Sequence, residues 1–213
     1  MANKNKTFTY ICEIRNRVLW TLLFFAIFLC VFFPFSSYLY NILALPVIKH
    51  LPSSSAMIAI SLTSPLLTPL QFVLYLAFFC TIPILFFQIW RFIAPALYKN
   101  ERKMVYPILF ASIFLFYLGA CFAYFVVLPL VINFLLQWVP DSVKIMPDIR
   151  YFLTFAMKLI IAFGLSFQVP VVVILLTLLK ITTPRALARK RPYVIVAAFV
   201  MGMLLTPPDV VSQ

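Results

Sequence analysis

The sequence of 213 residues is 65% hydrophobic and only 10% charged, with a formal net charge of +12. Soluble globular domains carry roughly 25% charged residues, so the composition excludes an ordinary soluble protein. Several uncharged runs exceed the roughly 20 apolar residues that a spanning helix needs, and they are continuous, whereas the strands of a membrane barrel alternate. We therefore predict an all-α integral membrane protein with about five transmembrane helices kinked by prolines.

The N-terminal segment, residues 1–17, is polar and then basic, and its apolar residues recur at helical spacing. This pattern predicts a short cytoplasmic helix at the membrane interface, followed by a first span over about 18–48. Pro34 and Pro46 are expected to bend or end that span, because proline interrupts the helical hydrogen-bond ladder. The apolar run is too long for the core of a cleaved signal peptide.

Four further apolar runs follow along the chain. They predict spans over about 70–90, 104–139, 151–179 and 193–205. The connection before the second span is rich in Ser, Thr and Pro, which favour helix starts, so we expect short helices there. The third run is longer than a bilayer needs and is expected to tilt or kink at Pro129. The fifth run would measure only about 20 Å as a helix, less than a hydrocarbon core of roughly 30 Å.

Basic residues alternate between successive connections. Counting Lys and Arg from the N-terminus gives four, one, four, two, five and none. Cytoplasmic connections are enriched in these residues, so the N-terminus and the loops 91–103 and 180–192 are predicted to be cytoplasmic parts of one membrane domain, 1–213. Because the bases collect at the ends of apolar runs, the net charge does not indicate nucleic-acid binding.

Two acids lie on the predicted cytoplasmic side. Glu101 lies among bases in the stretch FIAPALYKNERK, and Glu13 lies in the N-terminal run CEIRNR. An acid among bases indicates either a site for a cationic ligand or an exposed ion pair that contributes little to stability. For Glu13 that ion pair would be with Arg17, one helical turn later.

Two polar residues lie inside the predicted fourth span. Lys158 is within snorkelling reach of the outer interface. Gln168 is expected to face protein or water, and an inter-helix hydrogen bond would satisfy its amide.

The sequence offers little for catalysis or metal binding. The four cysteines show no metal-binding spacing, so we predict no metal site and no cofactor. No constellation of catalytic groups lies at one membrane depth, which argues against an enzyme. A small ion-coupled secondary transporter is the alternative function, although no inverted repeat is visible.

Five stretches occur in order along nearly the whole chain: CEIRNR, FIAPALYKNER, FGLSFQVP, RKRPYVIV and GMLLTPPD. Together they resemble the TatC family of twin-arginine translocase proteins. The resemblance implies the core receptor of a bacterial inner-membrane system that exports folded proteins with the proton-motive force. It also implies binding of di-arginine signal peptides, the single-span partners TatA and TatB, an oligomer of TatB–TatC units, and contact with membrane lipid.

The resemblance also assigns residues. Carboxylates that accept guanidinium groups suit a di-arginine ligand. The implied signal-peptide site comprises Glu13, Arg15, Arg17, Phe92, Pro95, Leu97, Glu101 and Arg102. The implied contacts with partner helices are Gln168, Met203, Leu205 and Thr206, and further family-matched positions are Pro46, Tyr124 and Asp209. Many family members have glutamate where this chain has Gln168, so a titrating role is not expected at that position.

Family members continue after the TPPD stretch into a sixth span and a cytoplasmic tail, whereas this sequence stops four residues after Asp209. We therefore expect a fragment or the product of a truncated gene, in which partner binding is affected more than signal-peptide recognition. The short fifth run beside Gln168 is expected to form a shallow, partly polar groove where a partner's membrane helix docks.

Overall fold

The computed structural model describes residues 2–42, 58–93, 105–137 and 148–180, together with isolated positions between 182 and 200. Its elements are α1 (Ala2–Phe32), the 3₁₀ turn η1 (Phe33–Phe35), α3 (Ser64–Ile93), α4 (Val105–Phe122), the π-helical turn η4 (Ala123–Val127), α5 (Leu128–Gln137), α6 (Ile149–Ser166) and α7 (Val169–Leu178). Within these described residues, four helical runs are long and apolar enough to cross a membrane: Cys12–Ile42, Ser64–Ile93, Val105–Phe134 and Ile149–Leu178. The predicted all-α membrane class is confirmed, and most of the expected fifth run lies outside the described residues.

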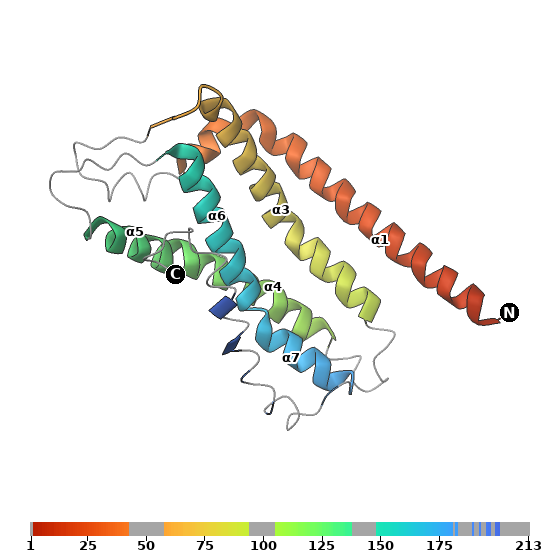
Figure 1. The fold of residues 1–213 in the computed structure, drawn as a ribbon. Coiled ribbons are helices and arrows are strands. Elements are labelled where there is room, and N and C mark those ends of the chain that lie inside the picture. Colours follow the sequence, from red (N-terminus) through yellow and green to blue (C-terminus); the bar gives the residue numbers. More distant parts are fainter. Residues whose placement is uncertain are drawn as a thin grey trace.

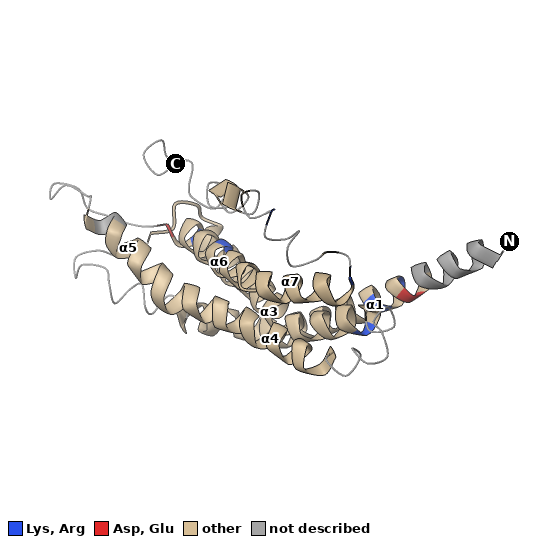
Figure 2. Ribbon diagram, turned by 90° about the horizontal axis from the view of Figure 1, so that it is seen from below, with Lys and Arg blue, Asp and Glu red and all other residues tan. Residues whose placement is uncertain are grey.

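The helices run back and forth between two ends of the molecule (Figure 1). The N-terminus, the end of α3, the start of α4 and the end of α7 lie at one end. The start of α3, the end of α5 and the start of α6 lie at the other. α1 packs mainly against α3, while α4 packs mainly against α6. Figure 2 views the same helices from below and shows charged residues of both signs on α1 and basic residues on α6.

The first helix differs from the expectation of a separate interfacial segment. α1 runs from Ala2 to Phe32 without a break. The stretch contains neither proline nor glycine, so nothing interrupts its hydrogen-bond ladder between the polar N-terminal segment and the apolar run. Pro34 lies in the 3₁₀ turn that follows, and helical structure then resumes over 36–42.

The later spans accommodate their prolines in different ways. The π-helical turn η4 directly precedes Pro129, whose ring and missing N–H are incompatible with a regular ladder. The α6–α7 run is interrupted just before Pro170. Pro83 lies inside α3 without ending it, and the Phe79 carbonyl, left without its helical donor, accepts a hydrogen bond of 2.8 Å from the Tyr117 hydroxyl of α4. A neighbouring helix thus satisfies the backbone group that the proline freed.

Glycine allows α4 and α6 to pack closely. A Cβ added at Gly119 would lie 2.8 Å from the Phe163 carbonyl oxygen, and one added at Gly164 would lie 2.8 Å from the ring of Phe116. Phe116 is fully buried. Small residues at such crossings are characteristic of membrane helices, where van der Waals packing drives association. This contact fixes α6 against α4 in the middle of the bundle.

The two connections at the end opposite the N-terminus meet. Asp148 caps α6, with its side chain accepting a hydrogen bond of 3.2 Å from the Arg150 amide. The amide of the intervening Ile149 donates to the Ile58 carbonyl at 3.0 Å. The short isolated bridge between Ile58 and Asp148 therefore holds the segment before α3 onto the start of α6.

A double-mutant cycle tests whether Pro83 creates the need for the hydrogen bond from Tyr117. Tyr117→Phe should lower the free energy of unfolding by about 0.5–1.5 kcal/mol, because the Phe79 carbonyl loses its donor. In a Pro83→Ala background the restored N–H can satisfy that carbonyl, so the same change should cost less. Unfolding of the four proteins in mixed detergent micelles measures the coupling. Equal costs in both backgrounds would contradict the role assigned to Pro83.

Candidate functional site

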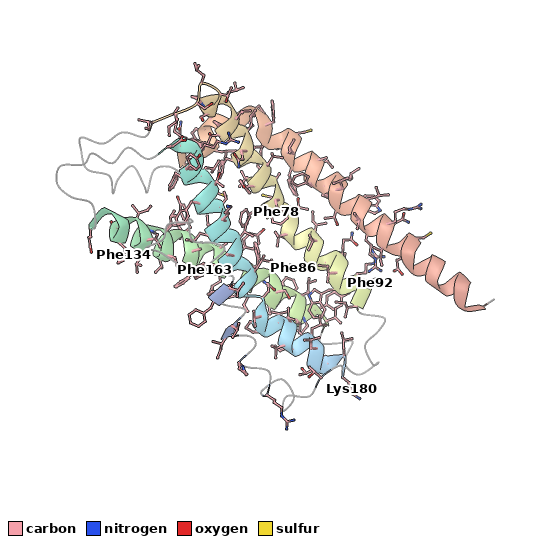
Figure 3. All side chains as sticks on the ribbon, viewed as in Figure 1. Phe78, Phe86, Phe92, Phe134, Phe163 and Lys180 are labelled. Carbon is pink, nitrogen blue, oxygen red and sulfur yellow. The ribbon has the colours of Figure 1, made fainter. Side chains whose placement is uncertain are left out.

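Arg17 connects α1 to α3 near the end of the molecule where the N-terminus lies. Its Nη1 donates to the backbone oxygen of Gln88 at 3.2 Å. Its guanidinium carbon lies 5.3 Å from the centre of the Phe92 ring, at the end of α3 (Figure 3). Arg17 Nη2 also donates to Glu13 Oε1 on its own helix. One side chain therefore holds a carboxylate, a backbone carbonyl and an aromatic face together.

Helical spacing explains why these groups meet. Glu13 and Arg17 are four residues apart on α1, and Gln88 and Phe92 are four residues apart on α3, so each pair lies on one face of its helix. The guanidinium group presents five donors in a planar fork and stacks on aromatic rings, which suits it to several partners at once. The side chain of Arg17 is only 15% exposed, so its contacts are shielded from solvent.

Glu13 remains accessible despite this ion pair. Its side chain is 43% exposed, and the contact with Arg17 uses only Oε1. Glu13 borders a polar hollow of about 290 Å³ that α1 and α3 form together. The hollow is lined by Glu13, Asn16, Arg17, Trp20, Gln88 and Arg91. Glu13 is the only acid among these lining residues, and its contact with Arg17 leaves its second oxygen, Oε2, which can therefore accept a hydrogen bond from a ligand.

The structure brings together three of the residues predicted for this site, namely Glu13, Arg17 and Phe92. Arg15 lies on the exposed side of α1. The other predicted positions lie outside the described residues: Pro46, Pro95, Leu97, Glu101, Arg102, Met203, Leu205, Thr206 and Asp209. Sequence reasoning missed Gln88, since it contributes a backbone oxygen and any residue type would supply the same acceptor.

Gln168 lies in a separate polar cluster inside the bundle. The residue is only 8% exposed, and its Nε2 donates to the Ser112 backbone oxygen at 2.8 Å. The hydroxyl of Ser112 accepts a hydrogen bond of 3.2 Å from the Trp90 indole. The amide thus makes the kind of inter-helix hydrogen bond that the sequence suggested, and its contact with a partner helix stays a prediction. Tyr124 lies in η4, with its ring centre 4.9 Å from that of Phe125.

Other chemistry-bearing groups do not gather into a second site within the described ranges. Lys158 lies on the exposed side of α6. Within the part of the chain that the structure describes, no group of three or more His, Cys, Asp or Glu side chains could hold a metal ion.

Comparison with known proteins places this geometry in one family. The family model for the Sec-independent protein translocase protein (TatC) matches residues 9–213. The TatC protein of Escherichia coli (strain K12) is 47% identical over 206 residues, covering 96% of this chain and 80% of that protein. The TatC protein of Haemophilus influenzae is 46% identical over 205 residues, with the same coverage. A crystal structure of the twin-arginine translocase receptor TatC in the detergent DDM matches with a TM-score of 0.85 and 37% identity, covering 96% of this chain and 91% of that one.

The bridging role of Arg17 predicts a difference between two conservative changes on α1. Arg17→Lys keeps the charge but replaces the planar fork by a compact ammonium, so the contacts with Gln88 and Phe92 are weakened. We expect the free energy of unfolding in detergent to fall by about 1 kcal/mol. Arg15→Lys, at an exposed position on the same helix, is the matched control and should change it by less than about 0.5 kcal/mol. Similar values for both variants would exclude the bridge as a stabilising contact.

Proposed function

The chain belongs to the TatC family of Sec-independent protein translocase proteins, and we propose that its polar hollow between α1 and α3 receives the arginines of a di-arginine signal peptide. As a member of this family it is a multi-pass protein of the bacterial inner membrane. The observation that carries the proposal is the half-exposed carboxylate of Glu13 in a hollow otherwise lined by neutral and basic side chains.

The chemistry of the hollow suits a guanidinium ligand. A carboxylate accepts a charge-assisted hydrogen bond from arginine, and such bonds are roughly twice as strong as neutral ones. Arg17 occupies Oε1 of Glu13 and so orients the carboxylate before the ligand arrives. The incoming guanidinium would then bind the second oxygen. In this arrangement Arg17 serves as a positioning residue for Glu13.

Two arginines require a second acceptor, and we assign that role to Glu101. The connection that carries it begins after Ile93 at the end of α3 and ends before Val105 at the start of α4. Both of these points lie at the same end of the molecule as the N-terminus (Figure 1). The proposal therefore requires Glu101 to come within reach of a ligand bound at Glu13. Phe92, Pro95, Leu97 and Arg102 would shape the walls around the two acids.

The rest of the proposal follows from the family. The chain would work with the single-span proteins TatA and TatB in an oligomer of TatB–TatC units, driven by the proton-motive force. Gln168, Met203, Leu205 and Thr206 are the proposed contacts with partner helices. Binding and transport need no catalytic group, so we propose no enzymatic activity. Because the chain belongs to this family, we no longer propose the alternative function of a small secondary transporter.

Removing either acid should weaken peptide binding. Glu13→Gln and Glu101→Gln each remove the negative charge from one acceptor. Hydrogen bonds to charged groups contribute roughly 1.5–3 kcal/mol, so we expect a loss of about tenfold or more in affinity for a di-arginine peptide. Arg150→Gln, which changes a charge at the opposite end of the molecule, is the control and should bind like the parent. Fluorescence anisotropy with a labelled peptide, compared with a di-lysine version, measures the change. Parental affinity in both acid variants would refute the site.

The proposal also requires the hollow to face the cytoplasm. The alternating base count places position 54 outside and position 189 inside. In a chain whose native cysteines are replaced, Ser54→Cys should react with a membrane-impermeant thiol reagent in intact cells, and Arg189→Cys only after lysis. If Arg189→Cys reacted in intact cells and Ser54→Cys did not, the predicted topology would be wrong.

A further inference from the structure

The polar hollow between α1 and α3 has one aromatic wall, the indole of Trp20. Among the described residues that line the hollow, Trp20 is the only aromatic one. Glu13, Asn16 and Trp20 follow one another at intervals of three and four residues, so they lie on one face of α1. Trp20 is 57% exposed. Its ring is therefore accessible to a ligand that enters the hollow beside Glu13.

A different face of α1 lines an apolar groove that lies beside the hollow. The groove has a volume of about 640 Å³ and is formed by α1 and α3. Arg17 and Gln88 line both the hollow and the groove, whereas Val18 and Thr21 line only the groove. Trp20 lines the hollow and not the groove. The indole therefore belongs to the polar surface of the hollow.

The charges of the hollow do not by themselves select arginine. Its charged lining residues are Glu13, Arg17 and Arg91, one acid and two bases, which gives a formal net charge of +1. A lining with a net positive charge does not favour a cationic ligand through Coulomb attraction alone. Lysine and arginine side chains carry the same charge, so charge does not distinguish them either. A preference for arginine must come from the shape of the guanidinium group, which is a planar fork that stacks on aromatic rings.

The same pair of helices already contains a guanidinium over an aromatic ring. The guanidinium carbon of Arg17 lies 5.3 Å from the centre of the Phe92 ring. Within the described part of the chain, no Lys or Arg side chain lies over the ring of Trp20. The neighbouring Phe24 ring is tilted by 33° against the indole, with the ring centres 6.3 Å apart. The indole thus keeps exposed surface for a cation that a ligand supplies.

We propose that Trp20 is a specificity-determining residue of the hollow, and that its indole stacks on a guanidinium of the ligand held at Glu13. The inference rests on the proposed function of the hollow. Tryptophan is the best of the aromatic rings for binding a cation. A guanidinium stacks on it as a weakly hydrated plane, whereas an ammonium is compact and strongly hydrated. Trp20 therefore favours two arginines over two lysines, while Glu13 binds either cation.

The ratio of two affinities tests this role. A labelled di-arginine peptide is displaced from the full chain in detergent micelles by unlabelled di-arginine or di-lysine peptide of otherwise identical sequence, and fluorescence anisotropy follows the competition. Trp20→Leu should lower the ratio of arginine to lysine affinity about two- to fivefold, the effect of a cation–π contact at an exposed site. Trp20→Phe keeps a ring and should lower the ratio less. Glu13→Gln should weaken both peptides, because the carboxylate accepts hydrogen bonds from either cation.

A swap of two neighbouring residues is the matched control. Tryptophan also anchors helices at the membrane interface, and loss of such an anchor would be a structural effect. Trp20→Leu combined with Leu19→Trp keeps the composition and an indole at nearly the same depth, but turns it about 100° around the helix. Leu19 is 53% exposed and does not line the hollow. The swapped chain should show the same lowered ratio as Trp20→Leu, and a ratio restored to that of the parent would overturn the stacking role.

The outcomes separate this inference from the proposed function. Binding that depends on Glu13, with the parental ratio of affinities in Trp20→Leu, would reject the role of Trp20 and leave the hollow as the binding site. Equal losses for both peptides in Trp20→Leu would also reject it, because a structural contact does not distinguish arginine from lysine. Binding that does not depend on Glu13 would overturn both the hollow and the role of Trp20.

Discussion

The contact of Arg17 with α3 is the interaction on which the site depends. α1 packs mainly against α3, and Arg17 crosses from one helix to the other to bind the Gln88 carbonyl and the Phe92 ring. The Arg17 side chain is only 15% exposed and needs such partners, because a buried charge without them is costly. The same residue holds Glu13 and lines both the polar hollow and the apolar groove. One side chain therefore contacts the acid, bridges the two helices and lines both the hollow and the groove.

The rest of the bundle keeps α3 in the position that this contact requires. Pro83 leaves the Phe79 carbonyl of α3 without its helical donor, and the Tyr117 hydroxyl of α4 donates to that carbonyl. The proline thus allows a hydrogen bond between α3 and α4. Gly119 and Gly164 let α4 and α6 approach closely. These contacts depend on backbone groups and on glycines that lack a side chain. Membrane helices associate through such contacts because the surrounding lipid is as apolar as the helices, so no hydrophobic driving force brings them together.

A polar cluster connects the break between α6 and α7 to the end of α3. Gln168 lies at that break and donates to the Ser112 carbonyl, and the Ser112 hydroxyl receives the Trp90 indole. Trp90 is two residues from Gln88 and from Phe92, the two α3 residues that contact Arg17. The side-chain amide of Gln168 thus forms its hydrogen bond within this chain. A partner helix that docks near α7 would meet a surface supported by this cluster.

The sequence by itself determined the membrane class, because uncharged runs of this length have no other stable environment, and the alternation of bases determined the expected orientation. The i,i+4 spacing of Glu13 and Arg17 also predicted their ion pair. The resemblance of five stretches identified the family. Only the tertiary structure decided that Arg17 reaches Gln88 and Phe92, 71 and 75 positions later. It alone revealed the apolar groove. The physical reason is that nearly every residue of the spans is apolar, so hydrophobicity does not distinguish a helix face that contacts lipid from one that contacts protein. Helix pairing depends instead on backbone oxygens, small residues and aromatic ring faces, and these contacts leave no periodic pattern in the sequence.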